Sequence, residues 1–346
     1  MPQSARNDAR RTAEQLIAAT RQQSAEYPRV LASHLPMLLE IHCRLGASSR
    51  RLLEVADFYN RCNQVPELAA AVAPITRDSW LEALGDRSRE CDYRRFFATE
   101  TERLGGHATI RRYAPELARG IGASALHALM RLAYGVLRND DAEMATALGY
   151  WAATWLPLRD EPRGPPDTDE PLALAAAMQP IAAFRDVEVE TDLLWHWMRA
   201  VGAKDEFAPL IGRLRIGVDT LERVTRASLA LYASTMSFEG LHAMTGSYWV
   251  RVISPHIDDP GRLVRYFWQA ILAVYPKIGM PTPLDQGQLD ALRALTPPPA
   301  AAIAAAAVDS DDEHDPSVAF TALQEHARSG DPLYLVLAAR RVGLLS

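Results

Sequence analysis

Long apolar segments and cysteines are scarce in this sequence of 346 residues. No run approaches the roughly 18 apolar residues that a membrane-spanning helix requires, and the first residues lack the apolar core of a secretory signal. We therefore expect no membrane association and a cytoplasmic location. Three cysteines, Cys43, Cys62 and Cys91, without C-x-x-C spacing argue against a disulfide framework or a structural zinc site. Each is expected to be a reduced, partly buried thiol.

Positive charge is not in excess either. The sequence has 37 Lys and Arg residues against 43 Asp and Glu residues, and only Lys204 and Lys277 are lysines. Binding to nucleic acid usually needs a basic excess or a basic stripe, so we expect no nucleic-acid partner. With 48% hydrophobic and 23% charged residues, the composition is that of an ordinary globular protein.

Apolar residues recur at intervals of three and four along most of the chain, and alternating patterns typical of strands are few. This periodicity predicts an all-α, multi-helix, bundle-like fold. Helices are expected at residues 8–24, 28–45, 49–60, 91–104, 118–137, 141–155, 190–199, 218–234, 238–254, 260–275 and 317–329. Gly46 is expected to cap one helix in the left-handed conformation, and Asp259 before Pro260 to cap the start of another.

Two proline-rich stretches interrupt the helical pattern. Residues 159–171 cannot continue a helix, because proline lacks the N–H group and clashes with the preceding turn. A second break follows at residues 296–300. No repeat with a period of 20 to 50 residues is visible. We expect one domain over residues 1–346, with helical halves at about 1–158 and 172–346 joined by the loop 159–171.

Sequence motifs for phosphate binding and for a nucleophilic serine are missing. The segment Gly120-Ile-Gly-Ala-Ser-Ala125 fits the dinucleotide pattern G-x-G-x-x-A, which requires a preceding strand and a later acidic residue. Its context here is helical, so a Rossmann site is not expected. Neither a P-loop nor a G-x-S-x-G motif is present.

Three histidines, His34, His127 and His242, stand in otherwise apolar helical stretches. A buried imidazole needs partners for its ring nitrogens, which a backbone group, a carboxylate or a metal can supply. For one histidine alone, a satisfied core residue is the better interpretation. Three on separate helices favour a metal site, because helix bundles build such sites from inward-facing side chains. His42 is expected to flank this region, and His107, His196 and His256 to be loop, packing or capping residues.

The sequence also resembles a known family. The segments that carry the resemblance are Ser33-His-Leu-Pro-Met37, Tyr93-Arg-Arg-Phe-Phe97, Ser124-Ala-Leu-His-Ala-Leu-Met-Arg-Leu-Ala-Tyr-Gly135, Ala147-Leu-Gly-Tyr-Trp-Ala-Ala-Thr-Trp-Leu-Pro157, Gly240-Leu-His-Ala-Met-Thr245 and Arg265-Tyr-Phe-Trp-Gln-Ala270. In order and spacing they are similar to the questin oxidase family. This resemblance implies an all-α oxygenase that opens the rings of anthraquinones and related aromatic polyketides with dioxygen as co-substrate. It implies either a Baeyer-Villiger type reaction with NADPH or a non-haem iron dioxygenase.

The resemblance implies iron ligands as well. In iron-dependent members several histidines and a carboxylated lysine hold the metal, and the histidines correspond to His34, His127 and His242. A fourth, His314, comes from an Asp-Asp-x-His motif, which reads Asp-Asp-Glu-His here. Two departures stand out: Arg131 replaces a second histidine of the middle motif, and no lysine follows His314.

The hydrophobic aromatic substrate implied by the resemblance needs lining and polar residues. Arg131, one turn after His127, could pair with a substrate phenolate or an acidic residue, and its alternative is a salt bridge on the helix surface. Tyr134 is the second candidate catalytic residue. Candidate lining residues are Tyr134, Trp151, Trp155, Tyr248 and Trp249. Trp151 and Trp155 share a helix face, where such a pair is more often core than pocket.

Two other functions remain open. A catalytically degenerate helical protein could bind a hydrophobic small molecule or a partner protein, as the missing lysine suggests. A metal-free, NADPH-assisted oxygenase could use the same cavity without iron.

Overall fold

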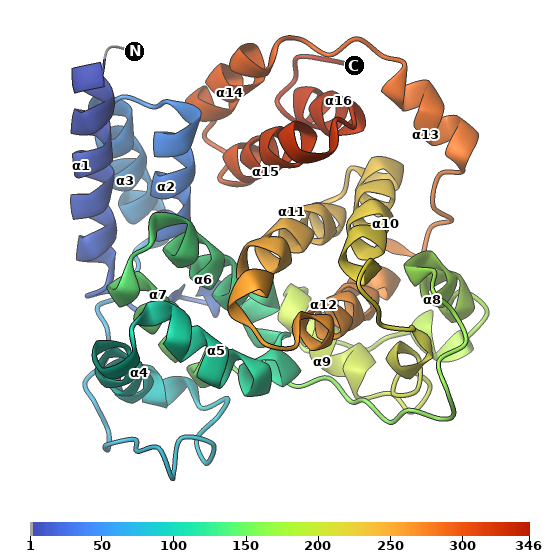
Figure 1. Cartoon of the computed structure of the whole chain (residues 1–346), viewed down its shortest axis with the longest axis horizontal. Helices are drawn as coiled ribbons and strands as arrows, with labels where there is room; N and C mark the ends of the chain where they lie inside the picture. The colour runs from blue at the N-terminus through green and yellow to red at the C-terminus, as the bar shows by residue number, and fades with distance from the viewer. Residues whose placement is uncertain (1–2) are drawn as a thin grey trace. The chain divides into compact units, whose positions relative to one another are not determined.

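The computed structural model describes residues 3–346 and is built almost entirely of helices (Figure 1). Sixteen α-helices and seven short 3-10 segments occur among the described residues, with one hairpin of two two-residue strands. The predicted all-α class is confirmed. Among the described residues, no helix combines the length and the apolar character needed to cross a bilayer.

The chain forms two compact units. Unit 1 combines the chain up to Leu68 with Leu284–Ser346, and unit 2 is Ala69–Pro283. The Pro-rich stretch 159–171 lies inside unit 2. The division of the chain at that loop stays a sequence prediction.

Unit 1 holds the two ends of the chain. Its helices are α1 (Gln3–Thr20), α2 (Leu35–Leu45), α3 (Ser49–Asn63), α13 (Gln286–Arg293), α14 (Ala300–Asp309), α15 (His314–Ser329) and α16 (Leu333–Arg341), and its strands are β1 (Glu26–Tyr27) and β2 (Leu31–Ala32). Helices α1, α2 and α3 pack together, and α15 packs on both α2 and α16. Buried residues one turn apart, such as Ala9, Ala13 and Ile17 on α1, make the core between the first three helices.

The helix expected at 28–45 begins seven residues later, so that prediction is wrong at its start. Pro28 follows β1, and the two residues after it, Arg29 and Val30, have positive φ angles of 73° and 59°. This left-handed turn closes an antiparallel hairpin in which Glu26 pairs with Ala32. His34 is therefore the N-cap residue of α2 rather than a residue on a helix face.

Of the four helices in the carboxyl-terminal segment, only one was predicted. The helix expected at 317–329 is α15, whereas α13, α14 and α16 were not predicted. Helix α14 is the Ala-rich run after the second proline break, and only Ile303 and Ala307 of it are buried. Such a short apolar run has too little periodicity to mark a helix face. Arg293 and Asp331 form a bidentate ion pair that links α13 to the turn before α16.

Unit 2 contains the other nine α-helices. They are α4 (Glu90–Leu104), α5 (Gly106–Leu117), α6 (His127–Arg138), α7 (Asp141–Ala153), α8 (Pro171–Met178), α9 (Leu194–Gly202), α10 (Thr220–Thr235), α11 (Phe238–Ile253) and α12 (Pro260–Val274). Its 3-10 segments are η1 (Arg87–Arg89), η2 (Ala118–Gly120), η3 (Ala123–Leu126), η4 (Ala182–Phe184), η5 (Ile211–Arg213), η6 (Ser254–His256) and η7 (Tyr275–Ile278).

The helix expected at 118–137 is broken, which corrects the prediction. Three consecutive residues, Ser124, Ala125 and Leu126, have positive φ angles of 43°, 54° and 72°. Non-glycine residues pay about 1–2 kcal/mol each in this region. Helix α6 starts after them, at His127. Apolar spacing alone gives no sign of this turn, because all three side chains are buried as they would be in a helix.

Other local predictions are confirmed. Gly46 ends α2 with φ 96°, and the Asp259 side chain accepts the backbone N–H of Arg262 at the start of α12. The chain from residue 159 to 170 has no helix, and α8 begins at Pro171. The segment at Gly120 is helical rather than the end of a strand, as expected. His107 is the second residue of α5, so the loop alternative for this histidine is wrong.

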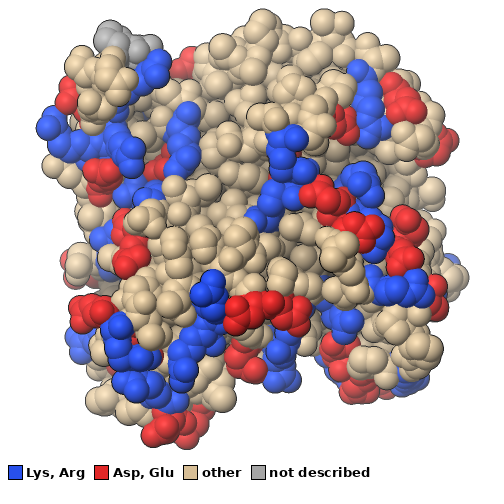
Figure 2. Space-filling view, in the orientation of Figure 1, with Lys and Arg blue, Asp and Glu red and all other residues tan. Residues whose placement is uncertain are grey.

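Charges on the face shown in Figure 2 are of mixed sign. Basic and acidic side chains lie interspersed there among uncharged residues. This pattern agrees with the small net charge of -6. The absence of a nucleic-acid partner stays a prediction.

Helices α4 and α7 approach so closely that only glycine fits at one point. A Cβ atom added at Gly149 would lie 2.8 Å from the backbone N and Cα of Arg94. We predict that Gly149→Ala lowers the free energy of unfolding by about 1–3 kcal/mol, because one of the two backbones must move. Urea denaturation measures the change.

Gly287→Ala is the matched control on helix α13. Its added Cβ would meet only the Asp285 carboxylate at 3.4 Å, an ordinary contact. Alanine is the better helix former, so this variant should be neutral or slightly stabilised. Equal stability of the two variants would refute the close approach of α4 and α7.

Candidate metal centre

His34 is held in unit 1 by backbone and side-chain contacts. Its backbone N–H donates to the Tyr59 hydroxyl at 2.8 Å, and its ring Nδ1 lies 3.1 Å from the Ala32 carbonyl oxygen. A carbonyl can only accept, so Nδ1 carries the proton and the ring lone pair is on Nε2. Only 8% of the residue is exposed. The hairpin turn before α2 thus presents a buried imidazole of defined tautomer.

Glu313 and His314 reach the same place from the turn that starts α15. Glu313 Oε1 lies 3.3 Å from His34 Nδ1, and the rings of His34 and His314 meet edge to face with centroids 5.3 Å apart. The Asp312 carboxylate accepts both the ring Nδ1–H of His314 at 3.0 Å and its backbone N–H at 2.9 Å. His314 therefore has the same Nδ1–H tautomer as His34.

His34, Glu313 and His314 are able to share one metal ion. One ligand atom of each residue lies within 4.8 Å of the other two, and we call this group the unit 1 triad. Two imidazoles and a carboxylate suit iron in non-haem oxygenases, and imidazole also suits zinc, copper and nickel. The Nδ1 hydrogen bonds match the rule that a metal-bound histidine donates its other N–H to a carbonyl or carboxylate.

The charge balance of the unit 1 triad also suits a cation. Burial raises the pKa of the Glu313 carboxyl, an effect that the nearby His314 opposes. Among residues 3–346, no lysine or arginine pairs with Glu313. A divalent cation would stabilise the ionised form of this carboxylate against the effect of burial. The residues present therefore fit a bound transition metal.

Two tyrosines surround the carboxylate. Tyr27 and Tyr59 lie close enough to Glu313 to influence each other's pKa. Burial raises the pKa of Tyr59 well above its usual value, and the neighbouring Glu313 adds to this effect. The same two causes raise the pKa of Tyr27 to about 12. Both hydroxyls therefore stay protonated, and that of Tyr59 is available to donate to the Glu313 carboxylate.

A cavity of about 320 Å³ opens beside the unit 1 triad. We call it the α3 pocket, because one face of α3 lines it. Its lining residues are Leu38, His42, Arg51, Val55, Phe58, Tyr59, Cys62, Asn63, Ser310, Asp311, Asp312, Glu313 and His314. The α3 residues recur three and four positions apart, as expected for a single helix face. The pocket has apolar and aromatic walls on α2 and α3 and a polar wall on the turn 310–314.

His127 and His242 form a second histidine pair, in unit 2. Their ring centroids lie 5.6 Å apart, and the rings meet edge to face. The Nδ1 of His127 donates to the Ser124 carbonyl at 2.5 Å and that of His242 to the Phe238 carbonyl at 2.8 Å. Both rings thus have the tautomer found in the unit 1 triad. The structure brings the four predicted ligands together as two pairs, one in each unit.

Arg131 is not a helix-surface residue. Its Nε lies 2.7 Å from Glu143 Oε1, and both side chains are almost fully buried. Arg94 is ion-paired with Glu90 close by, and the Arg131 charge helps to lower the pKa of Arg94, after burial. The interpretation of Arg131 as an exposed salt bridge is therefore wrong. Its predicted partner, an acidic residue, is present.

The predicted substrate-lining aromatics are all in unit 2. Trp151 is fully buried on α7, and its Nε1–H donates to the Gly120 carbonyl at 3.2 Å. Tyr134 on α6 and Tyr248 and Trp249 on α11 are also buried. Trp155 is half-buried, and its ring occupies the place that a Gly120 side chain would need. Their role toward a substrate stays a prediction.

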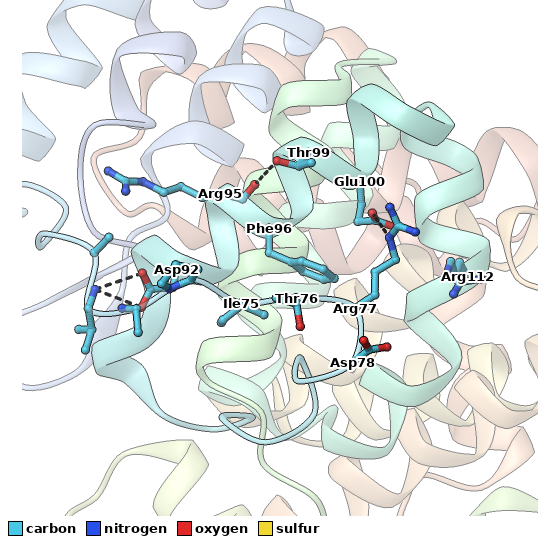
Figure 3. A pocket seen from close by; sticks show the side chains of 14 residues that line it. Ile75, Thr76, Arg77, Asp78, Asp92, Arg95, Phe96, Thr99, Glu100 and Arg112 are labelled. Atoms are coloured by element: carbon cyan, nitrogen blue, oxygen red, sulfur yellow. Dashed lines mark hydrogen bonds and ion pairs between the residues drawn. The ribbon is translucent and has the colours of Figure 1, made fainter.

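A larger cavity in unit 2, of about 850 Å³, lies between residues 71–78 and helices α4 and α5 (Figure 3). Its two buried carboxylates, those of Asp92 and Glu100, already accept hydrogen bonds from other residues of the protein. Asp92 accepts hydrogen bonds from Val72, Ala73 and Arg89. Glu100 on α4 accepts hydrogen bonds from Arg77, Arg103 and Tyr113. These bonds attach the loop 71–78 to α4, so we consider the acids structural.

The remaining predictions on side chains have a mixed outcome. The rings of His107 and His256 stack with centroids 4.2 Å apart, in agreement with a packing role. All three cysteines are free thiols. Cys62 is exposed and Cys91 buried, so the expectation that every cysteine is partly buried is wrong for these two.

Comparison with known families decides the relationship. A family model described as questin oxidase-like matches residues 31–320. The chain belongs to the questin oxidase-like family. Membership indicates an oxidoreductase that acts on aromatic polyketides, and it confirms the resemblance stated above. A search of curated proteins finds no match to the chain.

Sequence reasoning missed one residue of the unit 1 triad. Glu313 stands inside the Asp-Asp-x-His motif at its variable position, where the family pattern assigns no ligand. An acidic residue directly before a candidate ligand histidine was the available signal. The α3 pocket was missed because its walls come from segments about 250 residues apart.

Glu100 generates a prediction on acid stability. Hydrogen bonds from Arg103, and also from Tyr113 and Arg77, lower its pKa to about 2, against 4.5 for an ordinary glutamate. A lowered pKa stabilises the fold above pH 4.5, and this contribution is lost as the pH falls toward 2. We predict that Glu100→Gln lowers the free energy of unfolding by about 2 kcal/mol at pH 7 and by less near pH 3.

Urea denaturation at several pH values measures this difference. The control is Glu102→Gln, an exposed change two residues away on α4. It should alter neither the stability nor its pH dependence. A Glu100→Gln effect that is equally large at pH 7 and pH 3 would contradict the role assigned to the ionised carboxylate.

Proposed function

We propose that this questin oxidase-like protein is a non-haem iron oxygenase that inserts oxygen into an aromatic polyketide or anthraquinone-like substrate and opens its ring. The observation that carries the proposal is the unit 1 triad of His34, Glu313 and His314. Two histidines and one carboxylate leave coordination positions for dioxygen and substrate. Family membership supplies the substrate class.

Each residue of the unit 1 triad has a defined part. One ring nitrogen each of His34 and His314 and one Glu313 oxygen would hold the iron. Bound there, iron would supply the dioxygen chemistry that side chains do not provide. Glu313 would supply the anionic oxygen donor that the resemblance implies from a carboxylated lysine. The protonated Tyr59 hydroxyl, which lies beside Glu313, would donate to the carboxylate and help to orient it.

The α3 pocket would hold the substrate. Its volume of about 320 Å³ is at the lower end of the range for small-molecule sites. Phe58, Val55 and Leu38 offer apolar contact to a planar ring, while Glu313 and His314 border the same space. The ring would thus lie beside the metal ligands, and the apolar walls would exclude water.

The residues of unit 2 keep their predicted roles as part of the proposal. His127 and His242 offer two further imidazoles with Nε2 lone pairs for a metal. Arg131 and Tyr134 remain candidate catalytic residues. Use of NADPH is a further proposal, which NADPH oxidation upon addition of substrate and oxygen tests.

We predict near-stoichiometric iron in protein purified anaerobically without a metal-binding tag. His34→Ala and His314→Ala should bring the iron content close to background, and Glu313→Gln should reduce it, because each change removes one donor. The unit 2 prediction is that His127→Ala and His242→Ala also lose metal. Plasma mass spectrometry gives the metal content, and circular dichroism checks that the helices are intact.

His326→Ala is the matched control for the histidine variants. His326 lies on α15 in the same unit, and its Nδ1 is also bonded to a carbonyl, that of Asp331, at 3.0 Å. This variant should keep the wild-type iron content. Background iron in the wild-type protein after incubation with ferrous iron would contradict the iron site.

The α3 pocket yields a separate prediction. Phe58→Ala should raise KM for an anthraquinone substrate about fivefold, since a lost aromatic contact is worth about 1 kcal/mol. Iron content should not change. Oxygen uptake measures KM. Leu53→Ala is the control, because Leu53 is similarly exposed on α3 (54% against 44%) but does not line the pocket. Equal KM values for the two variants would place the substrate elsewhere.

A further inference from the structure

The turn 310–314, which carries Glu313 and His314, is bound by one arginine from α3 and one from α16. Arg51 on α3 donates to the backbone carbonyls of Val308 and Ser310 at 2.9 and 3.0 Å. Arg341, the last residue of α16, binds the opposite end of the turn through side chains. Arg51 binds backbone carbonyls of the turn. Arg341 instead binds a carboxylate that is itself hydrogen-bonded to the His314 ring of the unit 1 triad.

Arg341 reaches His314 through Asp312. Its Nη2 lies 2.5 Å from Asp312 Oδ2, while the other oxygen of that carboxylate, Oδ1, accepts the Nδ1–H of His314. The guanidinium also binds Asp315 Oδ1 through Nε at 2.6 Å. One rigid guanidinium thus fixes two carboxylates of the turn, at fixed angles to each other.

The second carboxylate is itself fixed from the other side. Asp315 Oδ2 accepts the Ser310 hydroxyl at 2.8 Å, and the same hydroxyl accepts the backbone N–H of Asp312 at 3.1 Å. Asp312 consequently has little freedom to rotate away from the imidazole. Its side chain is 47% exposed, so without Arg341 water would compete for the oxygen that faces α16.

We propose that Asp312 and Arg341 act as positioning residues that hold His314 in its Nδ1–H tautomer and aim its Nε2, so that helix α16 sets the metal affinity of the site. This inference takes the bound metal from the proposed function. The positioning of His314 itself is argued from hydrogen bonds within the protein. Neither Asp312 nor Arg341 is a member of the unit 1 triad. Partners of this kind typically change metal affinity 10- to 100-fold when removed.

Arg341 lies beyond the segment that the family model matches, which ends at residue 320. The Asp312 carboxylate lies inside it. The contact therefore joins a family motif to a helix outside the matched segment. Metal affinity in this chain would depend on α16 remaining folded against the turn.

The test compares Asp312→Ala and Arg341→Met with wild type in two measurements. The first is nitrogen-15 NMR of histidine-labelled, metal-free protein, which distinguishes an Nδ1–H from an Nε2–H ring. We expect the Nδ1–H form of His314 in wild type, loss of this preference in Asp312→Ala, and a mixture in Arg341→Met. His314→Gln assigns the signal.

The second measurement is the affinity for ferrous iron by competition with a chelator. We expect about tenfold weaker binding for Asp312→Ala and a smaller loss for Arg341→Met. Arg341→Lys keeps the charge without the fork and should lie between Arg341→Met and wild type. It serves as the informative variant if Arg341→Met does not fold.

Arg340→Met is the matched control. Arg340 is adjacent on α16, and its Nε donates to the Ser346 carbonyl rather than to the turn. This variant should keep both the tautomer and the affinity of wild type. Wild-type tautomer and affinity in folded Asp312→Ala and Arg341→Met would overturn the positioning role, even with iron bound. The expected tautomer changes in a protein that binds no iron would support the positioning role while refuting the proposed function.

Discussion

The candidate site depends on one repeated interaction: a histidine Nδ1–H that donates to a fixed oxygen. His34 and His242 use a nearby backbone carbonyl, as does His127, and His314 uses the Asp312 carboxylate. This bond fixes the tautomer and restrains the ring, so that the lone pair of Nε2 points away from the backbone that holds it. A buried imidazole without such a bond would have neither property, and the helices around it would not define a ligand direction.

Irregular backbone places these rings. His34 follows a hairpin closed by two residues with positive φ, and His127 follows a left-handed turn of three. In both cases the carbonyl that receives the Nδ1–H lies two or three residues upstream, in or next to the irregular segment. Such backbone conformations cost free energy and often occur at functional sites. Here the irregular turns position the carbonyl oxygens that accept the Nδ1–H groups of His34 and His127. The free-energy cost of these turns is therefore connected with the placement of the histidine rings.

The sequence predicted the helices whose apolar residues recur periodically. It did not predict local changes of backbone conformation or contacts between distant segments. Helical periodicity predicted α3, α4, α7, α11 and α12 well, with ends within about three residues of those observed. It failed at Pro28 and at Ser124–Leu126, where apolar residues continue through a change of backbone conformation. His34 and His314 were predicted as ligands from motif resemblance, and the structure places them together. Glu313 and the α3 pocket were not predicted, because their neighbours on α2 and α3 are far away in the sequence and follow no period. The role of Arg131 as a buried ion pair with Glu143 also depends on a contact between helices that spacing does not reveal.

The central claim is that the unit 1 triad of His34, Glu313 and His314 binds iron with imidazole and carboxylate ligands. X-ray absorption at the iron edge of ferrous-loaded wild-type protein, compared with Glu313→Gln and with His326→Ala, tests it directly. The account predicts a wild-type spectrum with imidazole scattering and nitrogen and oxygen ligands at about 2.0–2.2 Å, unchanged in His326→Ala and altered in Glu313→Gln. A spectrum of hydrated iron without imidazole scattering, or one that is identical in Glu313→Gln and wild type, would contradict it.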